Sequence, residues 1–597
     1  MDTLASLLAA HRAGERTPSE TVRETYRRIA VHDDPALFIT LRPEADLLAE
    51  AAVLEAGASR DLPLYGIPIA IKDNIDVKDV PTTAACPAFA YVPAEDATVV
   101  ARLRAAGALI VGKTNLDQFA TGLVGTRSPY GVPRNAFNAS LVPGGSSSGS
   151  ASAVSAGIVP LALGTDTAGS GRVPAMMQNI VGIKPSLGLV PNTGLVPACR
   201  TLDCISVFAL TVDDAMAALH VMAGDDAADP YSRPLPLGDL GAMRAPARLG
   251  ILPPDQREFF GDTQAAAAYE AALARFSALG ADLVTIDYTP FAECARLLYE
   301  GPWVAERWIV AEPLLTTNPD AVHPVTRAIT EPGGRASAAD AFRALYRLRE
   351  LKAKVDPVLA ELDAILLPTA PTPYALEAVL ADNIRLNSRN GTYTNFVNLM
   401  DLCGTAVPNV IADDGRPYGI TLLAPAGRDA EVASLARAFV AAGDLPLGAS
   451  GERHHPEPLP ETTDPRRLDL CVFGAHLSGM GLNGELLELG GRLVSAVETA
   501  PLYRMSLLDG PVARPGVVQV ESGGAAIAGE VWSLPFEGIG RLLARIPAPL
   551  GLGRVTLADG RQVTGFLAEA VGTQGCPDIT DYGGFRAFMA RKDARSA

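Results

Sequence analysis

The chain has 597 residues, of which 48% are hydrophobic and 20% are charged. This balance is typical of a globular protein and excludes intrinsic disorder, collagen and coiled coil, and the length allows about two to four domains. Lys and Arg number 50 against 67 Asp and Glu, which gives a formal net charge of -17. Because an acidic chain opposes polyanions, we exclude nucleic acid and anionic membrane surfaces as partners.

The seven cysteines are scattered along the chain and include no pair at metal-ligand or redox spacing. Scattered cysteines favour free thiols in a reducing compartment. The first residues have no basic segment before an apolar one, and no later run approaches the roughly 18 uninterrupted apolar residues of a membrane span. We therefore expect a soluble, cytoplasmic protein.

The first strong element is an apolar strand at 66–71, whose alternating isoleucines lead to Lys72. Further along, residues 107–114 match the phosphate-loop pattern G-x-x-x-x-G-K-T. The middle positions of that match are large apolar side chains of a strand, whereas a phosphate loop must expose backbone amides. We interpret the match as accidental, and a nucleotide-binding protein remains the alternative hypothesis from another functional class.

Two segments rich in small residues come next. Residues 143–150 read Pro-Gly-Gly-Ser-Ser-Ser-Gly-Ser and lead into a helix of Ala, Ser and Val that can pack very closely. The G-x-S-x-G pattern centred on Ser147 lacks the apolar strand that a nucleophile elbow requires. Residues 164–175 form a loop in which Pro174 is suited to open a helix. Because no histidine lies between residues 33 and 219, a reactive serine in either loop needs another base.

Helical faces followed by apolar strands recur at 96–111, 263–286 and 345–367, which predicts an α/β fold whose sheet is covered by helices on both faces. Residues 451–466 are polar and rich in proline. They predict a linker between a catalytic domain and a second domain. An Asp-Gly turn between apolar runs near residue 559 predicts a β-hairpin there.

The predicted domains are therefore a catalytic domain at 1–450, the linker at 451–466 and a small β-rich domain at 467–597. The strand that ends at Lys72 and the two small-residue loops together resemble the amidase signature family, whose Ser-cisSer-Lys triad hydrolyses amides. The resemblance covers most of the catalytic domain and implies a mixed central sheet. It also implies that Ser170 is the nucleophile, Ser146 is the bridging serine after a cis peptide bond, and Lys72 is the base.

A lysine is a base only when neutral, and the apolar strand before Lys72 suggests the burial that lowers its pKa. The resemblance further implies an oxyanion hole formed by backbone N–H groups of the nucleophile loop, a loop geometry that glycine permits. These groups belong to Thr167, Ala168, Gly169 and Ser170. Most relatives read Gly-Gly-Ser-Ile-Arg where this chain has Ala-Gly-Ser-Gly-Arg, and that departure resembles the allophanate hydrolase branch of the family.

Residues 298–307 and 116–131 resemble the same branch. The first likeness implies that Tyr299 and Arg307 hold a small anionic substrate, and their spacing predicts that both lie on one face of a single helix. In the second, Gly122 and Gly125 would let the backbone approach a small ligand closely. These four residues are the predicted substrate-binding set.

The C-terminal domain resembles the one appended to allophanate hydrolases, which is related in fold to gamma-glutamyl cyclotransferases. Its one histidine, His476, is a candidate for handling protons when the product loses carbon dioxide. The alternative is a packed polar residue in a domain used for assembly.

The resemblance implies that the protein hydrolyses allophanate, the carboxylated urea, through an acyl-enzyme on Ser170. Ammonia and N-carboxycarbamate would leave, and the latter would release carbon dioxide and a second ammonia. We expect no metal and no organic cofactor, and a homodimer. The alternative within the family is a general amidase or the amidase component of a glutamyl-tRNA amidotransferase acting on another amide.

Overall fold

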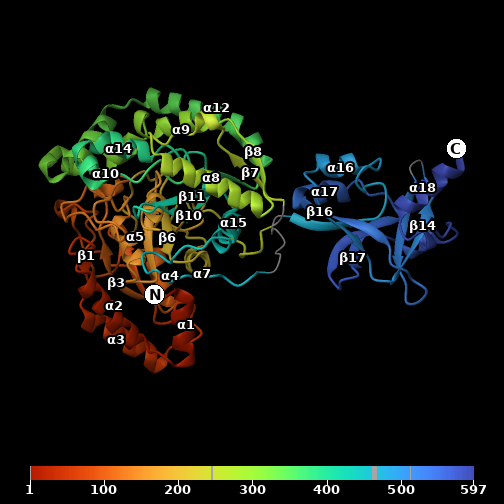
Figure 1. Cartoon of the computed structure of the whole chain (residues 1–597), viewed down its shortest axis with the longest axis horizontal. Helices are drawn as coiled ribbons and strands as arrows, with labels where there is room; N and C mark the ends of the chain where they lie inside the picture. Colours follow the sequence, from red (N-terminus) through yellow and green to blue (C-terminus); the bar gives the residue numbers. More distant parts are fainter. Residues whose placement is uncertain (1, 244–245, 460–466, 511–512, 597) are drawn as a thin grey trace. The chain divides into compact units, whose positions relative to one another are not determined.

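The computed structural model describes residues 2–243, 246–459, 467–510 and 513–596. It divides into two compact units, Met1–Glu461 and Thr462–Ala597 (Figure 1). The described part of the predicted linker contacts the first unit, where Arg437 donates to the carbonyl of Glu457 at 2.6 Å. Residues 460–466 lie outside the described residues, so the predicted division at 451–466 stays a prediction.

The first unit contains an 11-stranded sheet with both parallel and antiparallel neighbours. Strands β2 and β4 are parallel, whereas β4 and β6 are antiparallel, so the predicted mixed sheet is confirmed. Its strands, in spatial order, are β1 (Phe38–Leu41), β3 (Leu109–Thr114), β2 (Pro68–Lys72), β4 (Leu161–Asp166), β6 (Cys204–Ala209), β5 (Val181–Lys184), β10 (Leu402–Ile411), β11 (Pro417–Pro425), β9 (Ala364–Pro368), β7 (Arg248–Ile251) and β8 (Asp282–Thr285).

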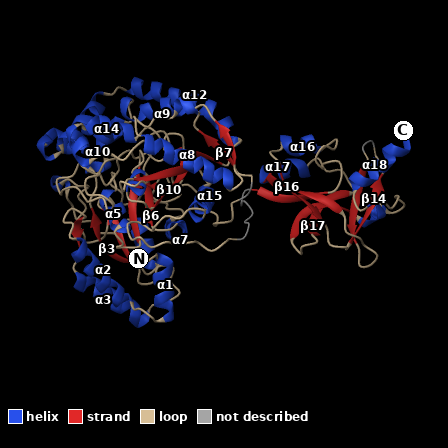
Figure 2. Ribbon diagram, viewed as in Figure 1, coloured by secondary structure: helices blue, strands red, loops and turns tan. Residues whose placement is uncertain are grey.

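The inner strands β2, β3, β4 and β6 are buried on both faces, which is why they are rich in apolar residues. Ile69 and Ile71 of β2 belong to one hydrophobic core, and Ala70 between them belongs to another. Helices cover the strands in Figure 2, as the helix-then-strand pattern predicts. Those that matter here are α2 (Pro18–His32), α3 (Glu44–Gly57), α4 (Thr98–Ala105), α5 (Ser148–Ser155), α6 (Val173–Met177), α7 (Val212–Met222), α8 (Thr263–Ala278), α9 (Thr289–Glu300), α10 (Val304–Thr317), α12 (Ala338–Ala360), α14 (Asn383–Asn390) and α15 (Asp429–Ala441).

The second unit is rich in β-structure, as predicted. The hairpin predicted around residue 559 is present, because β17 (Leu550–Thr556) pairs antiparallel with β18 (Gln562–Ala568). The five-stranded sheet of this unit is completed by β12 (Arg467–Val472), β13 (Arg492–Glu498) and β16 (Ala528–Pro535), and β14 (Tyr503–Leu508) pairs separately with β15 (Arg514–Gln519). Helices α16 (Asn483–Glu488), α17 (Phe536–Leu543) and α18 (Phe585–Ser596) accompany these strands.

The phosphate-loop lookalike is a strand, as we interpreted it. Residues 109–114 form β3, and all six are buried. Lys113 lies inside the protein, where its Nζ is 3.2 Å from Asp73 Oδ1 and 2.8 Å from Thr82 Oγ1. A lysine held by a buried carboxylate is not presented to a phosphate.

Candidate active site

Lys72 is the last residue of β2, and its side chain is completely buried. Its Nζ donates to Ser146 Oγ at 2.7 Å and to Thr165 Oγ1 at 2.7 Å. Burial lowers the pKa of Lys72 to about 7, against the opposing effect of nearby carboxylates, among them Asp117 and Asp203. An apolar strand has therefore placed a lysine that is substantially neutral at neutral pH beside a serine hydroxyl.

Ser146 lies in the loop before α5, and its peptide bond to Gly145 is cis, as the resemblance implied. The carbonyl of Ser146 accepts the backbone N–H of Asp117 at 3.0 Å. A Cβ on Gly145 would lie 2.1 Å from Asp117 Oδ2 and 2.5 Å from the backbone N of Gly125. Only glycine leaves room for these neighbours, which explains the small residues of this segment.

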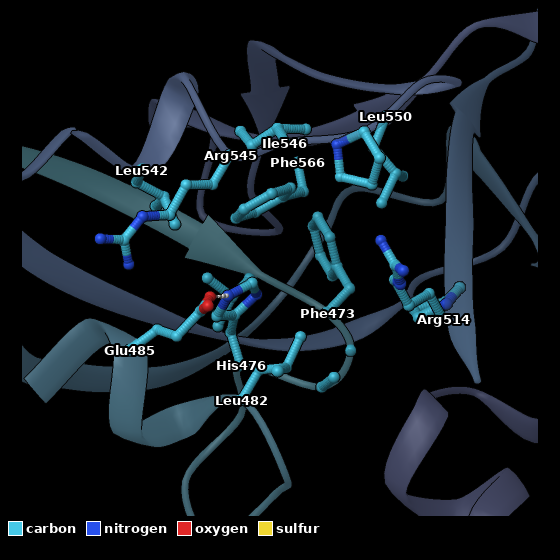
Figure 3. Close-up of a pocket in the computed structure, with 15 residues that line it drawn as sticks. Phe473, His476, Leu482, Glu485, Arg514, Leu542, Arg545, Ile546, Leu550 and Phe566 are labelled. Carbon is cyan, nitrogen blue, oxygen red and sulfur yellow. Dashed lines mark hydrogen bonds and ion pairs between the residues drawn. The ribbon is translucent and has the colours of Figure 1, made fainter. Parts of the chain in front are cut away.

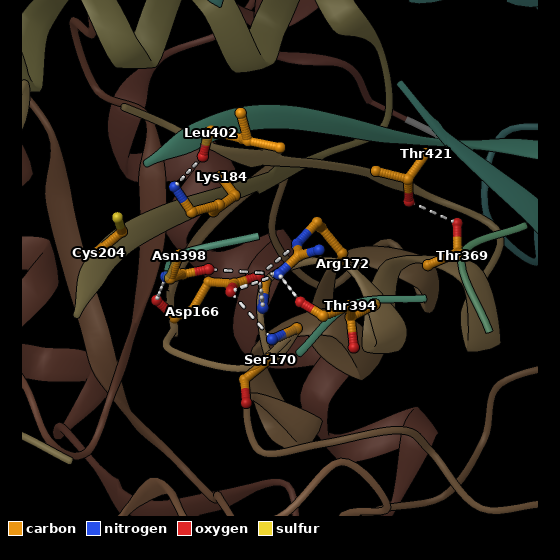
Figure 4. A network of polar contacts seen from close by, with 12 residues as sticks. Asp166, Ser170, Arg172, Lys184, Cys204, Thr369, Thr394, Asn398, Leu402 and Thr421 are labelled. Carbon is orange, nitrogen blue, oxygen red and sulfur yellow. Dashed lines mark hydrogen bonds and ion pairs between the residues drawn. The ribbon is translucent and has the colours of Figure 1, made fainter. Parts of the chain in front are cut away.

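Ser170 lies in the turn between β4 and α6, and Asp166 organises that turn (Figure 4). The two carboxylate oxygens of Asp166 accept the N–H groups of Gly169 and Gly171, each at 3.0 Å. They also accept two guanidinium hydrogen bonds from Arg172, both at 2.9 Å. Burial acts to raise the pKa of Asp166, but the Arg172 guanidinium outweighs it and the pKa is lowered. The turn is thus built around a charged carboxylate.

The Ser170 hydroxyl donates to the carbonyl of Gly122 at 3.3 Å. Of the four predicted oxyanion donors, the Gly169 N–H donates to Asp166 Oδ1 at 3.0 Å, so we assign the oxyanion to the other three. Thr167, Ala168 and Ser170 remain the predicted donors. The side chain of Thr167 is fixed by a hydrogen bond to Asp203.

Tyr299 and Arg307 do not share a helix, contrary to the prediction. Tyr299 lies in α9 and Arg307 in α10, and the helical structure is interrupted between them at Gly301 and Pro302. A Cβ on Gly301 would lie 2.3 Å from the carbonyl oxygen of Leu297, so this residue closes α9 in a way that only glycine allows. The two side chains nevertheless meet, because Arg307 Nη2 donates to the Tyr299 hydroxyl at 3.2 Å.

The Arg307 guanidinium is buried, with 3% of the residue exposed. Its Nη1 donates to Thr121 Oγ1 at 3.0 Å, which ties it to the segment that contains Gly122. Its Nε has no hydrogen-bond partner among the described residues. Burial acts to lower the pKa of Arg307, but Tyr299 and nearby acidic groups outweigh it and the pKa is raised. A charged donor whose Nε has no partner among the described residues is therefore bound to Thr121, next to the Gly122 carbonyl that accepts the Ser170 hydroxyl.

Gly122 and Gly125 lie in the segment that faces Ser170 and Arg307. A Cβ on Gly122 would lie 2.4 Å from Asp117 Oδ2, and Gly125 has φ +75° with the Gly144 carbonyl oxygen 2.6 Å from its would-be Cβ. Gly125 is therefore required for close packing of this segment against the loop of Ser146, and Gly122 makes room for the Asp117 carboxylate. Sequence reasoning missed Asp117, whose carboxylate accepts the N–H groups of Gly125 and Arg127 at 2.9 Å and 2.8 Å.

Two further residues of the site were also not predicted. Thr165 binds Lys72, and Asp203 holds Thr167 while accepting the N–H groups of Ala198 and Cys199 at 2.8 Å and 3.2 Å. Burial raises the pKa of Asp203 to about 6. Thr165 comes after the apolar residues of β4 and before the Ser170 turn, so its sequence position could have suggested a place in the site. Asp203 comes from a distant loop that no local sequence pattern connects to Ser170.

His476 lies in the second unit, where it lines a cavity of about 260 Å³ (Figure 3). Its Nε2 is 3.1 Å from Glu485 Oε2, and its ring stacks on Phe566 with centroids 5.2 Å apart. Burial lowers the pKa of His476, with Glu485 acting in the opposite direction. Arg514 and Arg545 line the same cavity, so its charged groups include two cations.

Among the residues that the structure describes, no three His, Cys, Asp or Glu side chains gather as metal ligands. Within the same ranges, no helix is long and apolar enough to cross a membrane.

The chain is similar to known proteins over most of its length. Residues 20–433 match the amidase family, and residues 468–590 match the allophanate hydrolase C-terminal domain. The urea amidolyase of Lachancea kluyveri is 43% identical over 93% of this chain, but the chain spans only 31% of that relative's length. The amidase component of the glutamyl-tRNA(Gln) amidotransferase of Picosynechococcus is 34% identical over 69% of this chain and 92% of the relative.

Among solved structures, an allophanate hydrolase of Kluyveromyces lactis superposes with a TM-score of 0.79 and 40% identity, with 99% of each chain covered. The match to the second unit is therefore to the allophanate hydrolase C-terminal domain, and its likeness to gamma-glutamyl cyclotransferases stays a prediction. Because the match to the amidase family covers residues 20–433, which is more than half of its length, the chain belongs to the amidase family.

Proposed function

We propose that this protein hydrolyses allophanate. The observation that carries the proposal is the buried Arg307 guanidinium, which pairs with Tyr299 beside the nucleophile segment and has an unpaired Nε among the described residues. A buried cation with a free donor is suited to a small substrate that carries a carboxylate, as allophanate does and a simple amide does not. The likeness to allophanate hydrolase and urea amidolyase over nearly the whole chain supports this choice over a general amidase.

In the proposed mechanism, neutral Lys72 takes the proton of Ser146 as Ser146 takes that of Ser170. The Ser170 oxygen attacks the amide carbonyl, and the N–H groups of Thr167, Ala168 and Ser170 stabilise the resulting oxyanion. The proton returns along the same path to the leaving nitrogen, and ammonia departs. Water then attacks the acyl-enzyme by the same route and releases N-carboxycarbamate.

The test is ammonia release from freshly prepared allophanate by the purified protein, run beside urea, biuret, malonamate and acetamide. The Ser170→Ala variant is the blank, because it lacks the nucleophile and keeps the fold. Preference for allophanate is expected. Activity on acetamide with none on allophanate would overturn the proposal and make the protein a general amidase.

We also propose that the cavity of His476 takes the N-carboxycarbamate and that its loss of carbon dioxide occurs there. The cations Arg514 and Arg545 suit a dianionic product, and Glu485 orients the ring. In a His476→Ala variant, the first ammonia is expected to be released at the normal rate. Release of the second ammonia is expected to be slower than in the unmutated protein. Release of both at the normal rate would instead favour assembly as the role of this unit.

We propose a cytoplasmic homodimer as the working form. All seven cysteines fall within the described residues and are free, which supports a reducing compartment. Helix α12 exposes Phe342 and Tyr346, large apolar side chains that suit contact with a second copy. Sedimentation velocity of the purified chain tests the dimer.

A further inference from the structure

Helix α14 carries asparagines at 383, 387 and 390, a spacing that places all three on one helical face. Asn383 Oδ1 accepts from Arg127 Nε at 2.7 Å, and its amide donates to Thr126 Oγ1 at 2.7 Å. Asn387 Oδ1 accepts the backbone N–H of Leu123 at 2.7 Å. This face of α14 therefore lies against residues 121–127, the segment that also holds Arg307.

Asn390 differs from the other two. It is fully buried, and neither its Oδ1 nor its Nδ2 has a hydrogen-bond partner among the residues that the structure describes. A buried amide with both ends unpaired destabilises a fold, and proteins retain such groups where a ligand completes them.

Asn390 lies between two contacts that flank the nucleophile. Three residues before it, Asn387 holds Leu123, whose neighbour Gly122 accepts the Ser170 hydroxyl. Four residues after it, Thr394 packs on the nucleophile loop, because a Cβ on Gly169 would lie only 2.6 Å from Thr394 Oγ1. Figure 4 shows Thr394 in the neighbourhood of Ser170. The unpaired amide thus belongs to the same region of the fold as Ser170.

We propose that Asn390 is a specificity-determining residue that binds the substrate, an inference that rests on the proposed function. Allophanate has an N–H between its carbonyl carbon and its carboxylate, so it presents a donor beside acceptor oxygens. The Asn390 Oδ1 accepts from that N–H, and Nδ2 donates to an oxygen of the substrate. Arg307 recognises the negative charge of the substrate carboxylate. Asn390 distinguishes the central N–H of allophanate from a methylene at the same position.

The test compares allophanate with malonamate, which has a methylene in place of that N–H, in the full-length protein carrying Asn390→Leu. Losing both hydrogen bonds is expected to lower kcat/KM for allophanate by about 10- to 100-fold. Malonamate keeps the oxygen that Nδ2 binds but has no N–H for Oδ1, so it is expected to lose only one hydrogen bond and to change by less than about 5-fold. The control is Ser388→Ala on the exposed side of α14, which should leave both substrates unchanged.

Thermal stability provides the second measurement. Because the amide has no partner among the described residues, Asn390→Leu is expected to keep or raise the Tm while allophanate turnover falls. A lowered Tm with equal losses on both substrates would overturn the inference and make Asn390 a structural residue. Unchanged turnover of allophanate would also overturn it. If the unmutated protein ignores allophanate altogether, the proposed function fails together with this inference.

Discussion

Lys72 is the residue on which the proposed chemistry depends, and its environment predicts how activity varies with pH. Burial lowers the pKa of Lys72 to about 7, and only the neutral amine is a base. We therefore expect kcat/KM to rise with pH through a single inflection near pH 7, as the fraction of neutral Lys72 increases. Initial rates of ammonia release across a pH series measure it.

Asp203 also titrates close to this range, since burial raises its pKa to about 6. An Asp203→Asn variant separates the two groups, because an inflection that belongs to Lys72 persists in it. Lys72→Met should lower kcat/KM by about 10³-fold or more at every pH. A profile that stays flat through neutral pH would contradict the role of Lys72 as the base.

Arg307 is expected to set the preference for a charged substrate. Arg307→Met should lower kcat/KM for allophanate by about 10²- to 10³-fold, because a buried anion would lose its charge partner. Acetamide carries no charge and should lose little. Arg307→Lys is the matched control, which keeps the charge but lacks the planar fork and should recover only part of the loss. Equal losses on both substrates would contradict the assignment.

At the scale of elements, strand β3 shows that a match to the phosphate-loop pattern need not form a phosphate-binding loop. Lys113→Ala or Lys113→Met would leave Asp73 buried without its cation, and its carboxylate is 3.2 Å from the lysine Nζ. We expect Lys113→Met to lower the free energy of unfolding by roughly 3–5 kcal/mol. The double variant Asp73→Asn, Lys113→Met should recover much of it, because no unpaired charge remains.

Urea unfolding of the single and double variants measures this coupling. Amidase activity at a temperature where each variant is folded should stay close to normal. Loss of activity in the folded double variant would revive the nucleotide-binding alternative for residues 107–114.

Helices α9 and α10 show a second effect at this scale. Periodicity alone treats residues 298–307 as one helix, but Pro302 lacks the N–H that a continuous helix needs. Gly301 then ends α9, and the turn brings Tyr299 and Arg307 together from two helices. The prediction of a single helix is wrong, although the two side chains are hydrogen-bonded, and their role in holding a substrate stays a prediction.

At the scale of the whole molecule, the residues hydrogen-bonded to Lys72 and Ser170 belong to the first compact unit. A chain ending at residue 459 is therefore expected to fold and to release the first ammonia with kcat/KM within about 3-fold of the full chain, since each unit has hydrophobic cores of its own. Ammonia assays and circular dichroism check this. Loss of the first ammonia in a folded truncation would contradict the separation.

The sequence alone predicted the α/β and β-rich regions, the strand that ends at Lys72 and the loops of Ser146 and Ser170. These features depend on local patterns that can be recognised in the amino-acid sequence, namely apolar strands, turns of small residues and glycines. The same reasoning could not connect Asp117, Asp203 or Asn390 to the site. Hydrophobic periodicity does not report where a single polar side chain lies, and the contacts that place these residues in the site are set by the tertiary structure.

The tertiary structure decided what these residues do. It buried Lys72 deeply enough to shift its pKa, directed the Gly169 N–H to Asp166, and left the amide of Asn390 unpaired among the described residues. Burial and hydrogen-bond partnership arise from contacts between segments far apart in sequence, whereas helices, strands and turns follow from neighbours. The sequence therefore determined which residue types are available for the chemistry. Only the folded chain determined their protonation states, their hydrogen-bond partners and which of their polar atoms have no partner among the described residues.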